Sequence, residues 1–252
     1  MSTVAETVND TVLVLSRELR PILRNPFSVI FSMVQPLVFL ALFGPLLPDP
    51  PGGGSALQWF VPGIVVMSCL FGTSTTGANL LMEIQTGAHE RMLVAPLRRS
   101  ALIVGRTLKE IVPMLAQTAI IVAVVVPFGF DLHLTGAVIG LLLLAVFCIG
   151  LGALSYTLGL ASRNQDWVFW AVQQTLLFPL LLLAGMLLPI DGGPGWLRTM
   201  SKFNPLTYVV DAERALFNGE VFSGTVAAGA IAAVVVAAGG LLVGVRAMRR
   251  AA

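Results

Sequence analysis

The stretch 134-LTGAVIGLLLLAVFCIGLGALSYTLGLAS-162 contains no Asp, Glu, Lys, Arg or His. A helix needs about 20 apolar residues to cross the hydrocarbon core of a bilayer, so this stretch is long enough for one crossing. Five more charge-free stretches of at least 20 residues occur, at 25–48, 50–82, 111–130, 167–190 and 221–245. The sequence therefore predicts an all-α integral membrane protein with a single transmembrane domain. Its six predicted transmembrane helices lie at about 27–47, 59–81, 109–129, 135–160, 168–189 and 224–246.

The composition agrees with a membrane location. Of the 252 residues, 56% are hydrophobic and 11% are charged, whereas soluble domains carry roughly 25% charged residues. The mean hydropathy is +0.89, and the net charge of +2 is too small to predict binding to nucleic acid. Cys69 and Cys148 lie inside apolar runs without a neighbouring metal ligand, so neither a disulfide framework nor a metal site is expected.

Arg and Lys are distributed unequally between the predicted connections. Cytoplasmic connections of membrane proteins carry an excess of these residues. With the N-terminus inside, the inner side receives twelve of the 15 basic residues and the outer side three. We therefore expect both termini in the cytoplasm. The inner residues are Arg17, Arg20, Arg24, Arg91, Arg98, Arg99, Arg106, Lys109, Arg163, Arg246, Arg249 and Arg250, and the outer ones are Arg198, Lys202 and Arg214.

The residues before the first predicted span have the pattern of an amphipathic helix. Over 10–25, apolar side chains recur at helical spacing, while Arg17, Arg20 and Arg24 fall on another face. This pattern predicts a helix that lies in the cytoplasmic interface of the membrane. Pro21 is expected to bend or break it. The alternative is a plain, positively charged anchor.

A long connection, 190–223, is predicted to lie outside the cell and to contain a capped helix. Asn204 can cap this helix, with Pro205 in its first turn and Leu206 at the start of its apolar face. Arg214 falls on the opposite, polar face. We expect a surface helix that packs on the ends of the spans.

Small residues mark two places where helices can approach closely. Gly136 and Gly140 are four residues apart, and so are Gly240 and Gly244. Small residues at this spacing let two helices in lipid come close together. We expect both pairs to serve packing within one chain rather than contact between two chains.

The sequence contains no motif of a nucleotide site or a hydrolytic enzyme. A Walker A loop and the HExxH, CxxC and GxSxG motifs are all absent, and neither Lys109 nor Lys202 follows a glycine-rich loop. We therefore expect a chain that is not an enzyme, with no catalytic residue, metal or cofactor of its own. The charge-free stretches also hold no carboxylate to carry a coupling ion. Energy for any transport is expected to come from outside the chain.

Neutral polar residues lie inside the predicted spans and are candidates for a substrate path. Prolines in the same spans are expected to kink their helices. The alternative for each polar residue is an ordinary hydrogen bond between helices, worth about 0.6–2 kcal/mol, and for any single residue this alternative is favoured. The candidates are Thr73, Thr76, Asn79, Gln117, Gln173 and Gln174, and the prolines are Pro36, Pro113 and Pro179.

The most basic stretch is 87-GAHERMLVAPLRRSALIVGRTLKE-110. Its charges alone predict a solvated loop that sets topology. Its order of residues resembles the cytoplasmic loop of the ABC-2-type permeases, in the branch of the daunorubicin/doxorubicin-resistance drug exporters and the nodulation lipo-oligosaccharide exporters. The segment that begins Asn204-Pro205-Leu206 also resembles a segment before the last span of that family. The matching loop residues are Glu90-Arg91, Met92-Leu93-Val94, Pro96 and Gly105-Arg106.

The resemblance implies a type-2 ABC exporter permease in the bacterial cytoplasmic membrane. Such a permease pairs with a second permease, identical or homologous, and with two ATPase subunits that bind ATP and Mg. It moves a hydrophobic or amphipathic substrate outward: a drug, a lipid or a glycolipid. The loop 83–106 then holds a coupling helix that docks on the ATPase through Glu90, Arg91, Met92, Leu93, Val94 and Pro96.

Two other functions stay open on the sequence. An ion-coupled secondary transporter would work without an ATPase and would be favoured by a carboxylate inside a span. A non-transporting membrane assembly protein would show no substrate-dependent stimulation of an ATPase.

Overall fold

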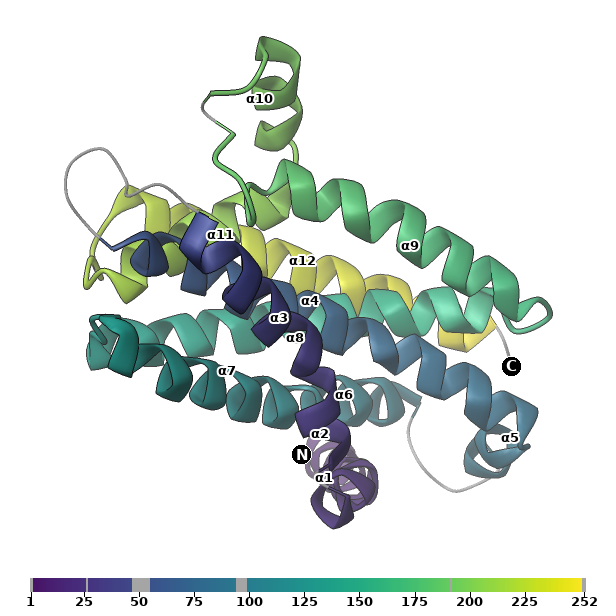
Figure 1. Cartoon of the computed structure of the whole chain (residues 1–252). Helices are drawn as coiled ribbons and strands as arrows, with labels where there is room; N and C mark the ends of the chain where they lie inside the picture. The colour runs from purple at the N-terminus through teal and green to yellow at the C-terminus, as the bar shows by residue number, and fades with distance from the viewer. Residues whose placement is uncertain (1, 26, 47–54, 94–98, 191, 251–252) are drawn as a thin grey trace.

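The computed structural model describes residues 2–25, 27–46, 55–93, 99–190 and 192–250. Every regular element within these ranges is helical. Long helices lie side by side and form the body of the molecule (Figure 1). They are α4 (Ala56–Gln85), α7 (Ile111–Val125), α8 (Leu134–Ala161), α9 (Asp166–Leu183) and α12 (Gly224–Arg250). The shorter elements are α1 (Ser2–Arg24), α2 (Phe27–Ser32), α3 (Val34–Phe43), η1 (Gly44–Leu46), α5 (Ala88–Leu93), α6 (Arg99–Lys109), η2 (Val126–Phe128), α10 (Gly195–Lys202) and α11 (Pro205–Phe217).

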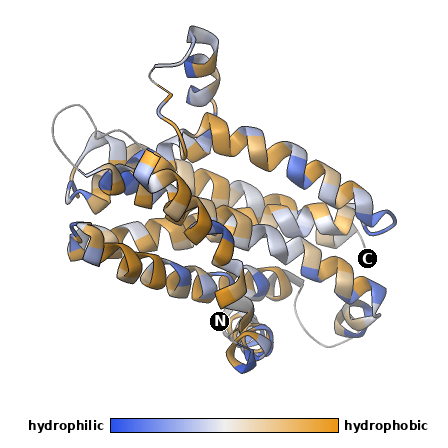
Figure 2. Cartoon of the chain, in the orientation of Figure 1, coloured by the Kyte–Doolittle hydropathy of each residue, from blue (hydrophilic) through white to orange (hydrophobic). Residues whose placement is uncertain are grey.

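Five helical segments in the described ranges are long and apolar enough to cross a membrane. The first predicted span, 27–47, is not among them, because its apolar helix is shorter, Ile30–Leu46, and is divided into α2, α3 and η1. Apolar residues follow the lengths of the long helices, and hydrophilic residues gather toward their ends (Figure 2). The five segments are Ala56–Gln85, Ala101–Phe128, Leu134–Ala161, Asp166–Leu183 and Gly224–Met248.

Two of the predicted prolines lie just after interruptions of the helices. A proline inside a helix has no N–H to donate, and its ring clashes with the carbonyl four residues earlier. Pro36 follows the interruption at Met33, and Pro113 follows the one at Glu110, between α6 and α7. Pro179 lies inside α9, which continues through it. The interruption at Glu110 separates the charged α6 from the apolar α7.

The helices alternate in direction between two ends of the molecule. The α5 end is where α4, α8 and α12 finish, at Gln85, Ala161 and Arg250, and the α11 end is where α4 and α12 begin. Val14 of α1 and Met248 of α12 belong to one hydrophobic cluster at the α5 end. Both terminal helices therefore reach the same end of the molecule.

Close contacts between α8, α11 and α12 depend on glycine. A Cβ on Gly150 of α8 would lie 2.6 Å from the backbone nitrogen of Ala237 in α12, and a Cβ on Gly240 would overlap the carbonyl of Gly150. Gly136 and Gly140 of α8 face α11 in the same way. The expected packing within the chain is therefore present at both glycine pairs. Nearby, Cys69 and Cys148 are buried as free cysteines, and their Sγ atoms lie 2.8 Å apart.

The helix α11 is part of the core, so the prediction of a surface helix was wrong. Its predicted apolar face is buried, and so is Glu213 on the next face. The guanidinium of Arg214 lies 3.9 Å from the ring centre of Trp59 and donates to the carbonyl of Gly185 at 2.7 Å. Asn204 caps the helix by accepting from the N–H of Leu206. α11 packs this deeply because α8 and α12 offer glycines where it crosses them.

The N-terminal helix α1 is longer than predicted and passes through Pro21 without a break. Pro21 lies in the last turn, where its carbonyl still accepts from the N–H of Asn25 at 3.0 Å. Val14 is buried against Gly105 of α6, where a Cβ would lie only 2.8 Å from the Val14 side chain. Other apolar side chains of α1, including Val12 and Leu13, are exposed. One face of α1 therefore packs on α6, and another is free to contact lipid.

Candidate functional site

Five charged side chains meet where α1, α4 and α6 come together at the α5 end. Arg106 Nε lies 3.5 Å from Glu18 Oε1, and the Arg106 guanidinium also pairs with Glu83. Lys109 Nζ lies 3.2 Å from Glu18 Oε2 and 3.8 Å from Glu110 Oε1. We call Glu18, Glu83, Arg106, Lys109 and Glu110 the buried charge cluster.

The cluster lies largely away from solvent. The exposed fractions of the side chains are 4% for Arg106, 8% for Lys109 and 5% for Glu110. Buried ions are tolerated when they are paired, because each loses its hydration. Arg106 also lies 5.3 Å from the ring centre of Tyr156 in α8, a cation–π contact. The cluster therefore joins α1, α4, α6 and α8 electrostatically.

The cluster corrects an expectation drawn from the sequence. The charge-free stretches hold no ionisable residue, and the basic stretch 87–110, with Arg106 and Lys109, was expected to face the cytoplasm, although the predicted span 109–129 begins at Lys109 and Glu110. Instead, Arg106, Lys109 and Glu110 lie within the apolar segment Ala101–Phe128 and are buried. The predicted loop 83–106 contains the end of α4, all of α5 and most of α6.

The short helix α5 contacts the cluster through Met92. The Met92 Sδ lies 3.4 Å from Arg106 Nη2 and also contacts the Arg17 guanidinium. Thioether sulfur is a weak acceptor, so this contact is mainly packing. Glu90 and Arg91 are exposed on α5, and Arg91 donates to the Thr86 carbonyl at 3.3 Å.

Of the remaining predicted coupling residues, the structure describes only the backbone of Leu93. Leu93 ends α5, and its side chain lies outside the described residues, as do Val94 and Pro96. The described part of α5 therefore has an exposed charged pair and one side chain, Met92, directed at the buried charge cluster.

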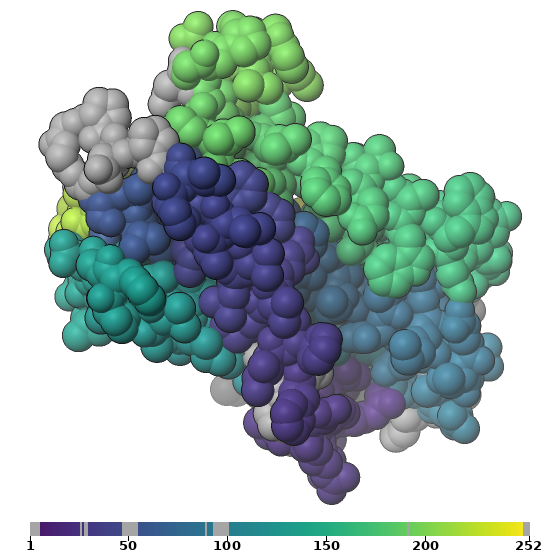
Figure 3. All heavy atoms as spheres, in the orientation of Figure 1, coloured from purple at the N-terminus to yellow at the C-terminus, as the bar shows by residue number. Residues whose placement is uncertain are grey.

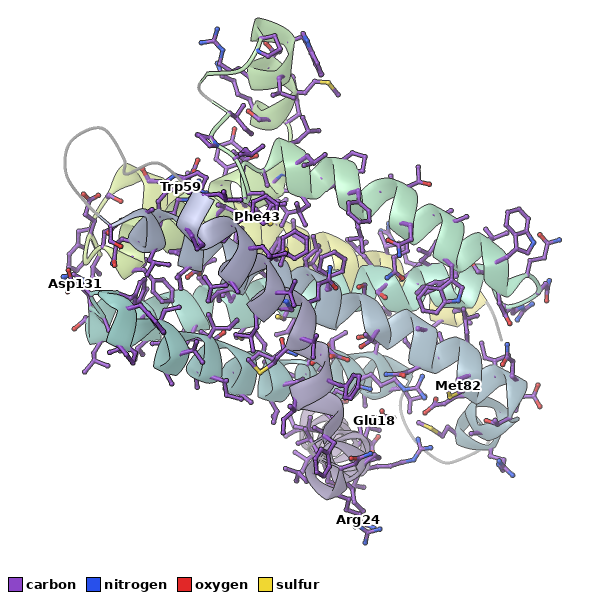
Figure 4. All side chains as sticks on the ribbon, in the orientation of Figure 1. Glu18, Arg24, Phe43, Trp59, Met82 and Asp131 are labelled. Carbon is purple, nitrogen blue, oxygen red and sulfur yellow. The ribbon has the colours of Figure 1, made fainter. Side chains whose placement is uncertain are left out.

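A cavity of about 530 Å³ opens beside the cluster. Glu18 of α1 and Met82 of α4, both labelled in Figure 4, lie on elements that face one another across it. We call this the polar cavity. Its lining residues are Glu18, Pro21, Ile22, Ser32, Gly72, Thr75, Asn79, Met82, Glu83, Thr86, Lys109, Glu110, Pro113 and Gln117.

The structure brings some of the predicted path residues to the polar cavity and leaves others away from it. Asn79 and Gln117 line it, and Gln117 Nε2 donates to Ser32 Oγ at 2.6 Å. Thr76 lies beside it and donates to Glu110 Oε1 at 2.8 Å. Thr73 instead donates to carbonyls of its own helix. Gln173 and Gln174 lie on α9, where Gln173 is half-buried and Gln174 is exposed.

A second hollow, of about 620 Å³, lies toward the α11 end between α3, α4 and α7. Its walls are almost entirely apolar. We call it the apolar pocket. Its lining residues are Leu37, Leu40, Ala41, Gly44, Pro45, Leu57, Val124, Val125 and Phe128.

A signal for the cluster was present in the sequence. Glu83 directly follows one charge-free stretch, and Lys109 and Glu110 directly precede the next. Consecutive antiparallel helices bring such flanking residues to the same depth. Opposite charges at both edges of one hairpin could therefore have predicted an ion pair. The contribution of Glu18 had no comparable signal, because it depends on how α1 folds back onto α6.

The described residues hold no group of three His, Cys, Asp or Glu side chains arranged for a metal ion. The site therefore has features suited to binding a ligand, namely a half-polar cavity lined by paired charges. It also has a short helix, α5, that contacts these charges.

Comparisons with known proteins agree with this picture. A family model described as ABC-2 type transporter matches residues 9–218. The daunorubicin resistance ABC transporter permease protein of Streptomyces coeruleorubidus is 26% identical over 85% of this chain and 77% of its own length. A protein of Cyanophora paradoxa named "Putative transport permease ycf38" is 30% identical over 77% of this chain and 69% of its own. A "Probable doxorubicin resistance ABC transporter permease protein" of Mycobacterium tuberculosis is 24% identical over 84% and 78%.

Proposed function

The chain belongs to the ABC-2 type transporter family and is a membrane subunit of an ABC transporter, and we propose that it exports an amphipathic substrate with energy from separate ATPase subunits. The observation that carries this proposal is the contact of α5 with the buried charge cluster through Met92. Through this contact, a displacement of α5 would be transmitted to α1, α4, α6 and α8, which meet at the buried charge cluster. An ATPase that docks on α5 could therefore move the membrane part without any ATP site in this chain.

The proposed topology has six crossings, with α2 and α3 together forming the first. α3 leads from the α1 region toward the α11 end and packs on α4. With the α5 end in the cytoplasm, the twelve-to-three distribution of Arg and Lys obeys the positive-inside rule. Both termini are then cytoplasmic, α1 lies in the inner interface, and α10 and α11 lie on the outer side of a bacterial cytoplasmic membrane.

The proposed complex contains two ATPase subunits, which hold ATP and Mg, and a second permease that is identical or homologous. Support for the ATPase comes from α5, which exposes Glu90 and Arg91 at the α5 end. Docking helices bind grooves through an apolar face with charges at the rim. Of the predicted coupling residues, we assign the apolar docking face to Leu93 and Val94, whereas Met92 contacts the buried charge cluster; Pro96 stays a predicted coupling residue that lies outside the described residues.

The size and lining of the polar cavity support the proposal of an amphipathic substrate, such as a drug, a lipid or a glycolipid. Its volume lies in the range of roughly 300–1,000 Å³ that is typical of small-molecule sites. Carboxylates and amides alternate in its wall with apolar groups such as Met82 and Pro113. Asn79 and Gln117 are the path residues that we place in contact with substrate.

A second function, ion-coupled transport, is favoured by one observation. Glu110 is a buried carboxylate within an apolar segment, and such residues often carry a coupling proton or ion. In this chain, however, Glu110 already interacts with Lys109 and Thr76. We therefore favour a structural role for this carboxylate.

The test is reconstitution with and without the ATPase. The chain is produced together with a candidate ABC ATPase subunit, purified with it and placed in liposomes. ATP-dependent movement of an amphipathic dye across the bilayer, absent from liposomes with this chain alone, is the expected result. Transport by this chain alone, driven by a proton gradient, would replace the proposal with the ion-coupled alternative.

A further inference from the structure

The polar cavity and the apolar pocket follow one another along the same helices. Ser32 and Gln117 line the polar cavity, whereas Leu37 and Val124 line the apolar pocket. Seven residues separate Gln117 from Val124, or about 10 Å along a helix. Figure 3 shows α2 and α3 crossing the visible face of the molecule between α7 and α9. A long molecule lying beside α3 would therefore meet a charged wall at one end and an apolar wall at the other.

The charged wall of the polar cavity is mainly acidic. Glu18, Glu83 and Glu110 line it, and Lys109 is the single basic residue among the lining residues that the structure describes. The Nζ of Lys109 already faces two of these carboxylates, at 3.2 and 3.8 Å. Arg106 lies behind the wall and pairs with Glu18 and Glu83.

This arrangement distinguishes a cationic ligand from an anionic one. A carboxylate has about four lone-pair sites, so a wall glutamate can accept from a bound ammonium group while keeping its internal partner. An anion would compete with Glu18 and Glu110 for Lys109; Glu18 would keep its pairing with Arg106, but the buried Glu110 would lose the cation that faces it. Asn79 and Gln117 add amide oxygens that can accept from an ammonium.

We propose that an amphiphile with an ammonium head group binds beside α3 and α7. Its head lies in the polar cavity, and its apolar chain follows α3 and α7 into the apolar pocket. The proposal rests on the exporter function above, because it names the class of substrate for the same site. With the α5 end in the cytoplasm, the head lies at the level of the inner leaflet and the chain points toward the membrane centre. A single-chain lipid of that leaflet has this orientation.

The test measures binding and needs no ATPase. The purified full-length chain in nanodiscs of neutral lipid is titrated with three photoactivatable probes of equal chain length: a hexadecylamine, a hexadecanol and a hexadecanoic acid. We expect the amine to saturate labelling at a concentration at least about tenfold lower than the alcohol, the difference that about 1.4 kcal/mol produces. The labelled peptides are expected to come from α3 and α7.

Variants then test whether the acidic lining of the polar cavity causes the preference for the amine over the alcohol. Glu110→Gln should reduce the advantage of the amine over the alcohol about tenfold, and Glu220→Gln, an exposed carboxylate after α11, should leave it unchanged. Since Glu110 is buried and its variant can misfold, the exposed residue Asn79 supplies a second test. Asn79→Asp should strengthen amine binding, and Asn79→Lys should reverse the preference toward the acid.

The outcomes separate the two proposals. The ammonium site would be overturned by any of three results: equal binding of amine and alcohol, stronger binding of the acid, or a preference that responds to neither Asn79 variant. ATP-driven export could still be measured with a dye in each case. Selective amine binding without ATP-driven transport in the reconstituted complex would overturn the export function and leave the site standing.

Discussion

Replacing Arg106 with glutamine tests the buried charge cluster directly. The change removes the cation that pairs with Glu18 and Glu83 and that lies over Tyr156. Removing one partner of a buried ion pair costs about 3–5 kcal/mol, because the other partner remains as an uncompensated charge. Glu18 and Glu83 keep 11% and 22% of their side chains exposed, so partial hydration places the expected loss near the lower limit, about 3 kcal/mol.

The assay is reversible unfolding of the purified protein in mixed micelles, followed by far-ultraviolet circular dichroism and extrapolated linearly to zero denaturant. Arg91→Gln is the matched control, because Arg91 is exposed and its guanidinium donates to the Thr86 carbonyl of its own loop. Exposed charges of this kind contribute about 0–1 kcal/mol. Arg106→Lys should recover part of the loss, since lysine keeps the charge but not the planar guanidinium that can pair with two carboxylates.

A double variant supplies the decisive comparison. If Arg106 and Glu83 are paired, then Arg106→Gln combined with Glu83→Gln should lose less stability than the sum of the single changes, because no unpaired carboxylate remains at position 83. The reasoning is refuted if Arg106→Gln stays within about 1 kcal/mol of the Arg91→Gln control, or if the two losses simply add.

Three more predictions follow from the same structure. For coupling, Met92→Ser should lower the ATP-driven transport rate of the reconstituted complex while unfolding stability stays close to wild type; an unchanged rate would remove Met92 from the transmission path. For topology, a cysteine in place of Asp131 should react with an impermeant maleimide outside intact cells, and one in place of Arg163 should react only after permeabilisation, since both positions are exposed at opposite ends; labelling of Arg163→Cys from outside would invert the orientation. For pH dependence, burial raises the pKa of the Glu213 carboxyl from 4.5 to about 8, so the folded state holds a proton that the unfolded state releases. The contribution of Glu213 to stability should therefore be fully present below about pH 4.5 and be lost between pH 4.5 and 8, by at most about 1.4 kcal/mol per pH unit; Glu213→Gln should flatten this part of the profile, and a profile identical to wild type would contradict the assignment.

The long helices could be predicted from sequence because hydrophobic length is a one-dimensional property. The stretch 134–162 predicts α8 closely, since no charge interrupts it and lipid leaves its backbone no partner outside a helix. The first span was harder to delimit. Its charge-free stretch, 25–48, is as long as 167–190, but the helix is interrupted at Met33, three residues before Pro36, and a count of apolar residues does not register that interruption.

The part that Glu18 plays in the buried charge cluster could not be predicted, because it depends on a contact between distant segments. Glu18 and Arg106 are 88 positions apart in the chain, and they meet only because Gly105 lets α1 approach α6 closely. Glu213 is buried for a similar reason, since Gly140 leaves room for its carboxyl group against α8. In both places a glycine on one helix makes room for another segment, and neither helix alone reveals what it will face.

The cluster also bears on how energy would reach the membrane helices. Within the described residues, its two cations each face two carboxylates, so a shift of α5 that moves Arg106 must either carry α1 and α4 along or separate buried charges. Separation leaves an ion without its partner in a poorly hydrated site, which is strongly unfavourable. Joint movement keeps every pair intact, and α1 can follow it because α1 contacts the rest of the chain chiefly at α6. The charges are therefore better suited to hold helices together during a movement than to carry an ion across, and this favours an external motor at α5 over ion-coupled transport.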